Sequence, residues 1–560
     1  MIECFYVDVA GRQMHYRRSG SGVPLIVMHP SPMSSAAMEP WITSMSKHFT
    51  VISPDTPGFG QSSPLPQEQP EIEDYAKAMI DLADALGLDR FLVAGSHTGS
   101  KIALSVAVQA PDRVIQLVMD GLAIYTDAER DEQLTRYTAP LEPLWHGGHL
   151  LLSWHTMRNM FIFWPWFRQE AERRMTDTVP DPQTLHGMVF DQMRAPAFWG
   201  LAYRAAFRFD THRALNHLQI PSILLAAEAD PLHGHLARLG TDTKNLTISS
   251  AGEQDHIAHI VRLLDASATA APVPPAPSVI HRGSTSRRYV STSKGNVHLR
   301  MDGDPAAPQV VLLHSSPGSA DSYAALIEDL AKDHLVIAPD LLGNGYSDAP
   351  NITDTDLTYY ADALAEVLDA LDLNCLVFGT HTGAGIAVEL AIARPERVFG
   401  VVAEGMPSFS NDEQEELLTR YTPSFAPEKN GEHLVRAWHM LRDMQLFWPW
   451  YRSEADHVRA TGPSSADSLQ HQFLQLLKSG ETYPLAYRAA FKYPAKERLA
   501  LVQVPTLLCA DPRDMLHPVT TELAVSAGDD ITFQELDSAK DQGTAWAIRG
   551  HLQQLIGAGK

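Results

Sequence analysis

The chain has 560 residues, of which 44% are hydrophobic and 20% charged, so it is long enough for two domains and apolar enough to bury substantial cores. Its formal net charge of −23 disfavours nucleic acid and anionic membrane surfaces as partners and favours a well-solvated surface. The three cysteines, Cys4, Cys375 and Cys509, are too far apart for a disulfide framework or a CxxC metal site.

No targeting or membrane segment is evident in the sequence. The opening stretch MIECFYVDVAGRQMHYRR lacks a basic region followed by an apolar one, and no run of about 18 apolar residues occurs. We therefore expect a cytoplasmic protein that does not enter a membrane, with its cysteines as buried thiols.

Short apolar runs alternate with longer helical patterns along the chain, which predicts βαβ units and a parallel sheet. The strand candidates in chain order are PLIVMH, HFTVISPD, RFLVAG, VIQLVMDG and SILLAAEAD, and then QVVLLH, HLVIAPD, NCLVFG, RVFGVVAEG and TLLCADPRD. Polar residues follow the carboxyl ends of these runs, and open α/β sheets bind ligands at that edge. The sequence thus predicts an α/β fold with a site at this edge.

The second five runs repeat the first five. LTRYTAP, from Leu134, returns as LTRYTPS, from Leu418; FWPWFR returns as FWPWYR, and LAYRAAFRF as LAYRAAFKY, each about 284 residues later. A period of this length indicates a duplicated domain and not a solenoid. Between the copies, Ala266 to Ser286 is rich in Ala, Pro and Ser and predicts a semi-rigid linker. We therefore predict domains at 1–265 and 287–560.

A sharp strand-to-helix turn is predicted once in each copy. The segments GSHTG, at 95–99, and GTHTG, at 379–383, place small residues around a tip that must project into a pocket. The tip residue is His97 in the first copy and His381 in the second. A frame shifted by one residue would place Thr98 at the tip instead, but the glycines favour His97.

Together with two further motif pairs, this turn gives the chain a family resemblance. MHPSPMSS and LHSSPGSA follow the first strand candidates, and SPDTPGFGQS and APDLLGNGYS follow the second. The chain resembles the α/β-hydrolase superfamily over nearly all of both halves, with His in place of the usual Ser, Asp or Cys nucleophile. The resemblance implies two tandem domains, each a mostly parallel sheet flanked by helices, with helical caps at about 121–210 and about 405–493.

The resemblance also assigns an oxyanion hole, a set of N–H donors that stabilises charge developing on a substrate oxygen. In the first copy its donors would be Thr98 and Ser31. In the second copy they would be Thr382 and Ser316. The histidines that open the preceding loops, His29 among them, are expected to hydrogen-bond backbone below the pocket.

For the catalytic acid and histidine, the family order implies Asp230 and His256. Asp120, after the preceding strand, is the alternative acid. The second copy offers Asp514 and Glu404 at the two acid positions, but Thr544 aligns with His256. His551 lies further on, in the expected final helix, and is expected at the surface. The first half is therefore the expected working site, and the second a partly degenerate copy.

Aromatic and basic residues in the first cap are candidate substrate contacts. Trp154, His155, Arg158 and Trp164 lie in WHTMRNMFIFWPWFR, and a tryptophan-rich cap would suit an apolar or aromatic substrate. The competing interpretation places the tryptophans in the core and His155 and Arg158 on a polar surface.

Several roles remain open for a histidine at the tip. His97 can be a nucleophile that forms an acyl-imidazole, or a base or donor in a non-covalent hydrolysis, hydration, lyase or C–C cleaving reaction. The site can also be a dead hydrolase that binds a ligand or partner. A metal held by His97, His256 and a carboxylate is disfavoured, because the acid is expected to orient His256. We expect hydrolysis of an apolar or aromatic ester, lactone or similar carbonyl compound, without cofactor or metal, by domains paired within the chain. A homo-oligomer is a further option.

Overall fold

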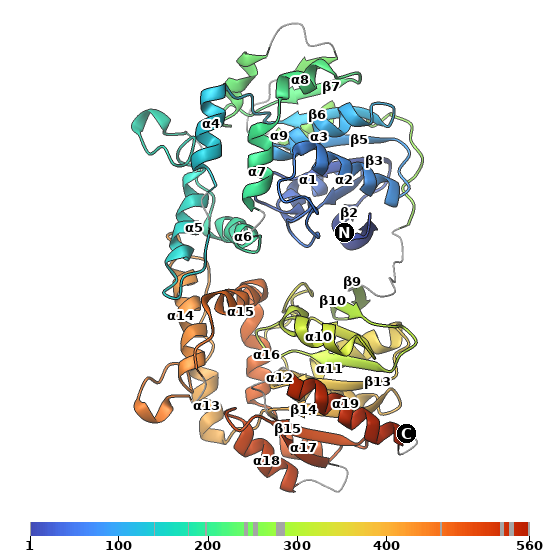
Figure 1. Cartoon of the computed structure of the whole chain (residues 1–560), viewed down its shortest axis with the longest axis vertical. Coiled ribbons are helices and arrows are strands. Elements are labelled where there is room, and N and C mark those ends of the chain that lie inside the picture. Colours follow the sequence, from blue (N-terminus) through green and yellow to red (C-terminus); the bar gives the residue numbers. More distant parts are fainter. Residues whose placement is uncertain are drawn as a thin grey trace. The chain divides into compact units, whose positions relative to one another are not determined.

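The computed structural model in Figure 1 describes residues 2–138, 141–176, 178–195, 199–239, 245–249, 256–275, 286–459, 462–526, 531–536 and 542–557. The chain forms two compact units. The first comprises Met1–Glu142, Gly148–Val279 and Pro427–Gly431, and the second comprises Pro143–Gly147, Ile280–Ala426 and Glu432–Lys560. Of the linker predicted at 266–286, residues 276–285 lie outside the described residues, and Ser286 opens a strand.

The first unit is built on one eight-stranded sheet with the order β1-β2-β4-β3-β5-β6-β7-β8. β1, β2 and β4 pair antiparallel, and from β4 through β8 the neighbours are parallel. The strands are β1 (Glu3–Val9), β2 (Arg12–Ser19), β3 (Val23–Met28), β4 (Phe49–Pro54), β5 (Phe91–Ser96), β6 (Val114–Asp120), β7 (Ser222–Leu225) and β8 (Leu246–Ile248).

The second unit repeats this sheet, with the order β9-β10-β12-β11-β13-β14-β15-β16. The strands are β9 (Ser286–Thr292), β10 (Gly295–Asp302), β11 (Gln309–Leu313), β12 (Leu335–Pro339), β13 (Cys375–Thr380), β14 (Val398–Glu404), β15 (Thr506–Ala510) and β16 (Ile531–Glu535). The predicted fold class, two tandem and mostly parallel sheets flanked by helices, is confirmed.

Each sheet is covered on both faces because successive strand residues point to opposite sides. In β3, Ile26 and Met28 pack into the core beneath α2 and α3, whereas Leu25 and Val27 pack with α1 and α9. The helices of the first unit are α1 (Glu39–Met45), α2 (Ile72–Ala85), α3 (Thr98–Gln109), α4 (Asp127–Arg136), α5 (Gly148–Asn159), α6 (Pro182–Met193), α7 (Trp199–Arg208), α8 (Thr211–Asn216) and α9 (His256–Leu263), with short 3-10 helices at Ser35–Met38, Ala171–Arg173 and His233–Arg238.

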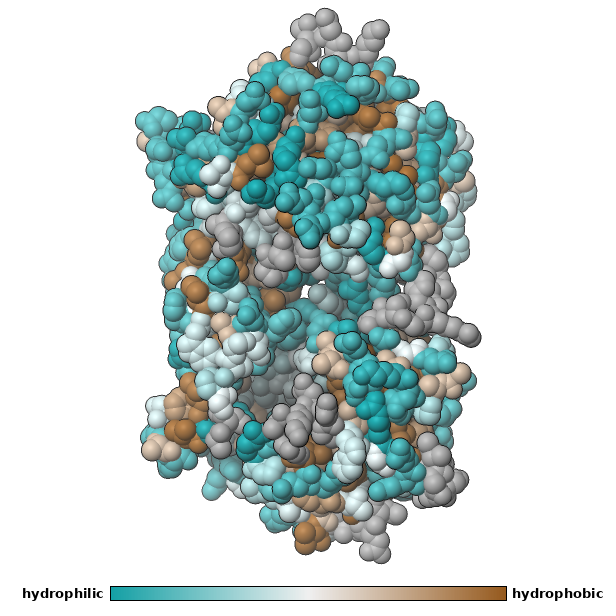
Figure 2. Space-filling model, in the orientation of Figure 1, coloured by the Kyte–Doolittle hydropathy of each residue, from teal (hydrophilic) through white to brown (hydrophobic). Residues whose placement is uncertain are grey.

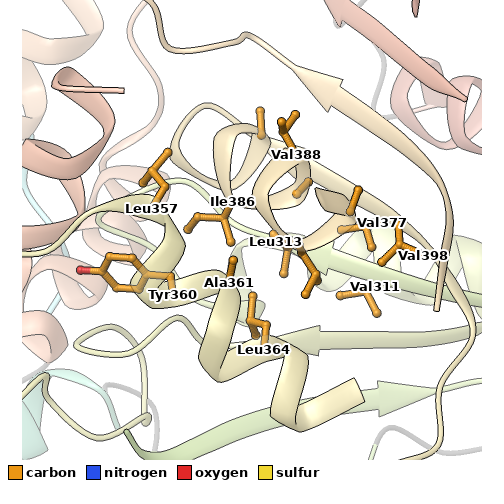
Figure 3. Close-up of a cluster of buried hydrophobic side chains, with 14 of the residues drawn as sticks. Val311, Leu313, Leu357, Tyr360, Ala361, Leu364, Val377, Ile386, Val388 and Val398 are labelled. Atoms are coloured by element: carbon orange, nitrogen blue, oxygen red, sulfur yellow. The ribbon is translucent and has the colours of Figure 1, made fainter. Parts of the chain in front are cut away.

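The second unit shows the same alternation. Figure 3 shows Val311 and Leu313 of β11 facing the helical residues Leu364 and Ile386, while Val310 and Leu312 pack on the opposite face. The helices are α10 (Ala324–Leu330), α11 (Leu357–Ala370), α12 (Thr382–Ala393), α13 (Asn411–Arg420), α14 (Glu432–Leu446), α15 (Ala466–Ser479), α16 (Tyr483–Phe491), α17 (Ala495–Leu499), α18 (His517–Ser526) and α19 (Gln542–Gly557), with 3-10 helices at Ala320–Tyr323, Ala455–His457 and Gly480–Thr482.

The visible surface is largely polar. The face drawn in Figure 2 is mostly hydrophilic, and its apolar residues form small separate groups. Within the described ranges, no helix is long and apolar enough to cross a bilayer.

Candidate active site

The tip of the predicted turn has the strained backbone that such a turn requires. His97 joins β5 to α3 with φ 52° and ψ −108°, a left-handed conformation that is uncommon for a residue with a side chain. The two glycines of GSHTG are needed because a Cβ at Gly95 would lie 2.3 Å from the Gly99 oxygen, and one at Gly99 would lie 2.3 Å from the Met28 oxygen. His97 therefore stands at the carboxyl edge of the sheet, at the start of a helix.

The His97 imidazole is bound directly by an acid. Nε2 of His97 donates to Oδ2 of Asp230, which follows β7, over 2.7 Å. Burial lowers the pKa of His97, but the charge of Asp230, its hydrogen bond and the charge of Asp120 outweigh this effect and raise the pKa to about 9. Burial likewise tends to raise the pKa of Asp230, but His97 holds it below its ordinary value. The pair is therefore stabilised in its charged form.

His256 has a different partner from the one implied by the family order. Its Nε2 lies 2.8 Å from Oδ1 of Asp120, at the end of β6, and this hydrogen bond raises the pKa of His256. His256 Nδ1 is buried, and no described residue hydrogen-bonds it. The structure thus brings His97, Asp230, His256 and Asp120 together at one sheet edge, but as two His–Asp pairs.

The length of the tip side chain explains this pairing. An imidazole reaches further than a hydroxyl, so His97 itself contacts the carboxylate that was expected to orient His256. Gly121 makes room for the ring, because a Cβ there would lie 2.6 Å from Cδ2 of His97. Gly121 was not among the predicted site residues, although a glycine follows the acid in both VMDG and VAEG.

A cavity of about 60 Å³ opens beside His97. Ser31 and Thr98 line it, as an oxyanion hole would require, and the Tyr203 hydroxyl fixes the loop by donating to the Ser31 carbonyl over 2.5 Å. The remaining lining residues are mostly apolar or aromatic: Lys101, Ala123, Tyr125, Tyr137, Trp164, Tyr203, Ala206, Phe207 and Leu232. Of the two histidines at this sheet edge, His97 lines the cavity and His256 does not.

Lys101 was also not among the predicted site residues, although its sequence context distinguishes it. It is a lone charge in TGSKIALSVAV, the apolar helix that follows the tip, where the second copy reads TGAGIAVELAI.

Of the four candidate substrate contacts in the insertion between β6 and β7, Trp164 lines the cavity. Trp154 is fully buried in the core of the unit, and its indole N–H donates to the Lys429 carbonyl over 3.1 Å. His155 is exposed and Arg158 is partly buried, and neither lines the cavity. His29 bonds backbone as expected, since its Nε2 accepts from the Thr56 N–H over 2.9 Å.

The second unit reproduces half of this arrangement. His381, with φ 47°, bonds Asp514 over 2.8 Å, and a Cβ at Gly405 would lie 2.6 Å from its ring. Burial, opposed by His381, raises the pKa of Glu404 to about 7, and the partner of Glu404 is the Thr544 hydroxyl. Thr544 therefore stands in the place of His256, as the alignment of the copies predicts.

The remaining residues predicted in the second copy are all buried. His551 is buried, and its Nε2 lies 3.3 Å from the Pro505 carbonyl, so its predicted surface position is wrong. It packs inward because α19 covers one face of the sheet. Thr382 and Ser316 are buried at the positions equivalent to Thr98 and Ser31. Over the described part of the chain, no group of three or more His, Cys, Asp or Glu side chains is arranged to hold a metal.

Comparison with known proteins shows similarity to several hydrolases. The chain is 29% identical over 254 residues to the (E)-2-((N-methylformamido)methylene)succinate hydrolase of Acinetobacter baylyi, covering 45% of this chain and 85% of that protein. It is 36% identical over 136 residues to a 2-hydroxymuconate semialdehyde hydrolase of a Pseudomonas species, covering 23% and 47%. It is 32% identical over 118 residues to haloalkane dehalogenase 2 of Mycobacterium bovis, covering 21% and 41%. The matches to the last two proteins therefore span less than half of their lengths.

Solved structures resemble parts of the chain. One is a hydrolase from Pseudomonas aeruginosa, with a TM-score of 0.38 and 18% identity over 48% of this chain and 98% of that one. The family model described as the alpha/beta hydrolase fold matches residues 23–150 and 308–529, which is more than half of the sequence and includes both histidine turns. The chain therefore belongs to the alpha/beta hydrolase fold family, and it carries the family's domain twice.

Proposed function

We propose that the first unit hydrolyses an apolar or aromatic carbonyl compound, such as an ester or a lactone. The observation that carries this proposal is the His97–Asp230 pair, whose imidazole precedes Thr98 at the start of α3 and lines an aromatic cavity. The similarity to hydrolases supports the reaction class.

His97 acts as a general base in this proposal. Asp230 holds the Nε2–H, and no described residue hydrogen-bonds Nδ1, which leaves that nitrogen for a water molecule. Nδ1 takes a proton from the water as its oxygen attacks the carbonyl carbon. The N–H groups of Thr98 and Ser31 stabilise the oxyanion, and the imidazolium returns the proton to the leaving oxygen as the tetrahedral intermediate collapses. His256 acts indirectly: it orients Asp120, and the charge of Asp120 helps to raise the pKa of His97.

The rest of the chain has supporting roles in this proposal. The insertion around α5 to α7 is a cap that supplies aromatic contacts, including Trp164, to the substrate. The second unit is a partly degenerate partner, since Thr544 replaces the second histidine. We retain the 1–265 and 287–560 domains, their pairing within the chain and a cytoplasmic location as predictions.

Paired variants test the site. His97→Ala is expected to lower kcat/KM for p-nitrophenyl esters and aromatic lactones by roughly 10²-fold or more, because the base is lost. The matched variant His381→Ala removes the same side chain from the second unit and should leave the rate unchanged. Equal rates for wild type and His97→Ala across both substrate classes would exclude His97 as the base. An acyl adduct on the His97 peptide in quenched reactions would identify a nucleophile instead.

The pH dependence separates a base from a cationic donor. Because the pKa of His97 is raised to about 9, the neutral base is a minor form at pH 7. The wild-type kcat/KM should therefore increase from pH 6 and level off above about pH 9. A decrease above about pH 9 would show that protonated His97 is the active form.

A further inference from the structure

Lys101 is a buried lysine in the wall of the same cavity as His97. It lies one helical turn after His97 on α3, is 2% exposed, and lines the cavity together with Thr98. It is thus a cation placed beside the reacting groups and away from bulk water.

The contacts of Lys101 leave its charge unbalanced. Nζ donates to the Ala206 carbonyl over 2.7 Å and lies 5.1 Å from the centre of the Tyr125 ring and 5.9 Å from that of Phe209. An ammonium carries three donors, and among the described residues its hydrogen-bond partner is the Ala206 carbonyl and no carboxylate forms an ion pair with it. Burial, together with the like charge of Arg130, lowers the pKa of Lys101 to about 7. An unpaired buried charge is costly, so a group of opposite charge placed beside it would stabilise it.

A partly buried lysine of the second unit, Lys478, shows the ordinary solution, which is a carboxylate partner. Lys478 in the second unit lies 3.1 Å from Asp321, and its pKa is raised. The position equivalent to Lys101 in the second unit is Gly385, where a Cβ would lie 2.4 Å from Leu357. An uncompensated cation beside the tip histidine is therefore a feature of the first unit that the duplication does not repeat.

We propose that Lys101 binds a carboxylate of the ligand, so that the first unit acts on carbonyl compounds with an anionic end and an apolar or aromatic body. That the bound compound is a substrate rests on the proposed function. That Lys101 binds its carboxylate does not. A carboxylate would supply the counter-charge that no described side chain provides, and it would accept the donors that Ala206 leaves unused. The aromatic lining would hold the body of the ligand.

Binding of matched probes tests the inference without turnover. Benzoate and benzamide have nearly the same shape and differ in charge. Isothermal titration calorimetry on the full chain should show that wild type binds benzoate at least tenfold more tightly than benzamide. Lys101→Met should lose that preference and leave benzamide affinity unchanged. Lys77→Met removes an exposed lysine on α2 and is the charge-matched control, which should behave as wild type.

The outcomes separate this inference from the proposed function. If Lys101→Met binds benzoate as tightly as wild type, or if wild type does not prefer benzoate, the inference is overturned even where His97→Ala abolishes hydrolysis. If the preference is present and depends on Lys101 while His97→Ala leaves hydrolysis intact, the inference stands and the catalytic proposal does not. Lys101→Gln, which can still donate to Ala206, replaces the methionine variant if that variant misfolds.

Discussion

Gly121 shows how much of the site depends on an absent side chain. Its φ of +69° and its position against the His97 ring mean that any Cβ meets the imidazole at 2.6 Å. Gly121→Ala should therefore displace the ring from Asp230 and lower kcat/KM by roughly 10²-fold, because small displacements of a catalytic group are costly. Steady-state kinetics on aromatic esters measures this effect.

Gly405→Ala is the matched control for this substitution. It introduces the same methyl at 2.6 Å from His381 and a similar backbone strain, but in the second unit. Its rate should equal that of wild type, with a comparable loss of stability. Equal rates in both variants would show that the placement of the His97 ring does not limit the reaction.

Lys101 should leave a signature in the pH dependence of stability. Its folded pKa of about 7 lies below the unfolded value of roughly 10.4, so between these values only the unfolded chain binds the proton, and stability increases with pH. Lys101→Met removes this increase and should stabilise the protein by a few kcal/mol near pH 7, with little gain near pH 10. Calorimetry at the two pH values measures the difference.

Lys478→Met is the control of opposite sign. The folded pKa of Lys478 is raised, so its ion pair stabilises the fold below the unfolded pKa. That variant should be less stable than wild type at pH 7. A Lys101→Met variant that is destabilised at pH 7 would contradict the unpaired state of Lys101.

At the scale of elements, the strands and the turn were predictable because they depend on local sequence. All ten apolar runs became strands, and GSHTG and GTHTG formed the turns between β5 and α3 and between β13 and α12. The His97–Asp230 pairing was not predictable, because spacing along the chain does not specify which of two histidines at one sheet edge reaches a given carboxylate. Lys101 was missed because burial of a single charge in an apolar helix is set by tertiary packing. The β1–β2 hairpin, with alternating partly polar residues, was also not among the strand candidates.

Glu404, at the end of β14, is a second group whose titration should affect stability, and its side chain hydrogen-bonds Thr544 near the start of α19. Burial raises the pKa of Glu404 to about 7, so between pH 4.5 and 7 the folded chain binds a proton that the unfolded chain releases, and stability decreases as pH increases. Glu404→Gln should abolish this decrease and stabilise the protein at pH 8 by up to about 3 kcal/mol, with no gain at pH 5. Melting temperatures at both pH values test this.

Asp514→Asn is the contrasting variant on the same site. Burial tends to raise the pKa of Asp514, but His381 outweighs this effect and lowers the pKa to about 2. The charge of Asp514 therefore stabilises the fold at neutral pH, and Asp514→Asn should destabilise the protein at pH 8. Equal gains for Glu404→Gln at pH 5 and pH 8 would show that Glu404 is not protonated at the lower pH.

At the scale of the whole molecule, the sequence repeat and the compact unit have different boundaries. The first unit includes Pro427–Gly431, and its Trp154 packs against that segment: a Cβ at Gly431 would lie 2.7 Å from Cγ of Trp154. Gly431→Ala should therefore destabilise the first unit by roughly 2–4 kcal/mol, through the clash and the positive φ of 83°. Hydrogen exchange of the α5 amides, read by mass spectrometry, should increase.

Gly480→Ala provides the comparison, since Gly480 also has a positive φ but has open space around its Cβ. It should cost only about 1 kcal/mol and leave exchange in α5 unchanged. The same exchange in both variants would mean that the contact between Gly431 and Trp154 contributes nothing to α5.

The Trp154–Lys429 hydrogen bond also limits which fragments of the chain can retain all their native contacts. A fragment that ends at residue 275 keeps Trp154 but loses the carbonyl that its buried indole N–H requires, together with the glycine that its ring covers. The reverse holds for Trp438, whose indole N–H donates to the Trp145 carbonyl over 2.9 Å. The boundary between the two sequence repeats is therefore not the boundary between the two compact units, since each unit includes a short segment of the other repeat. Either repeat expressed alone would leave a buried indole N–H without its carbonyl acceptor.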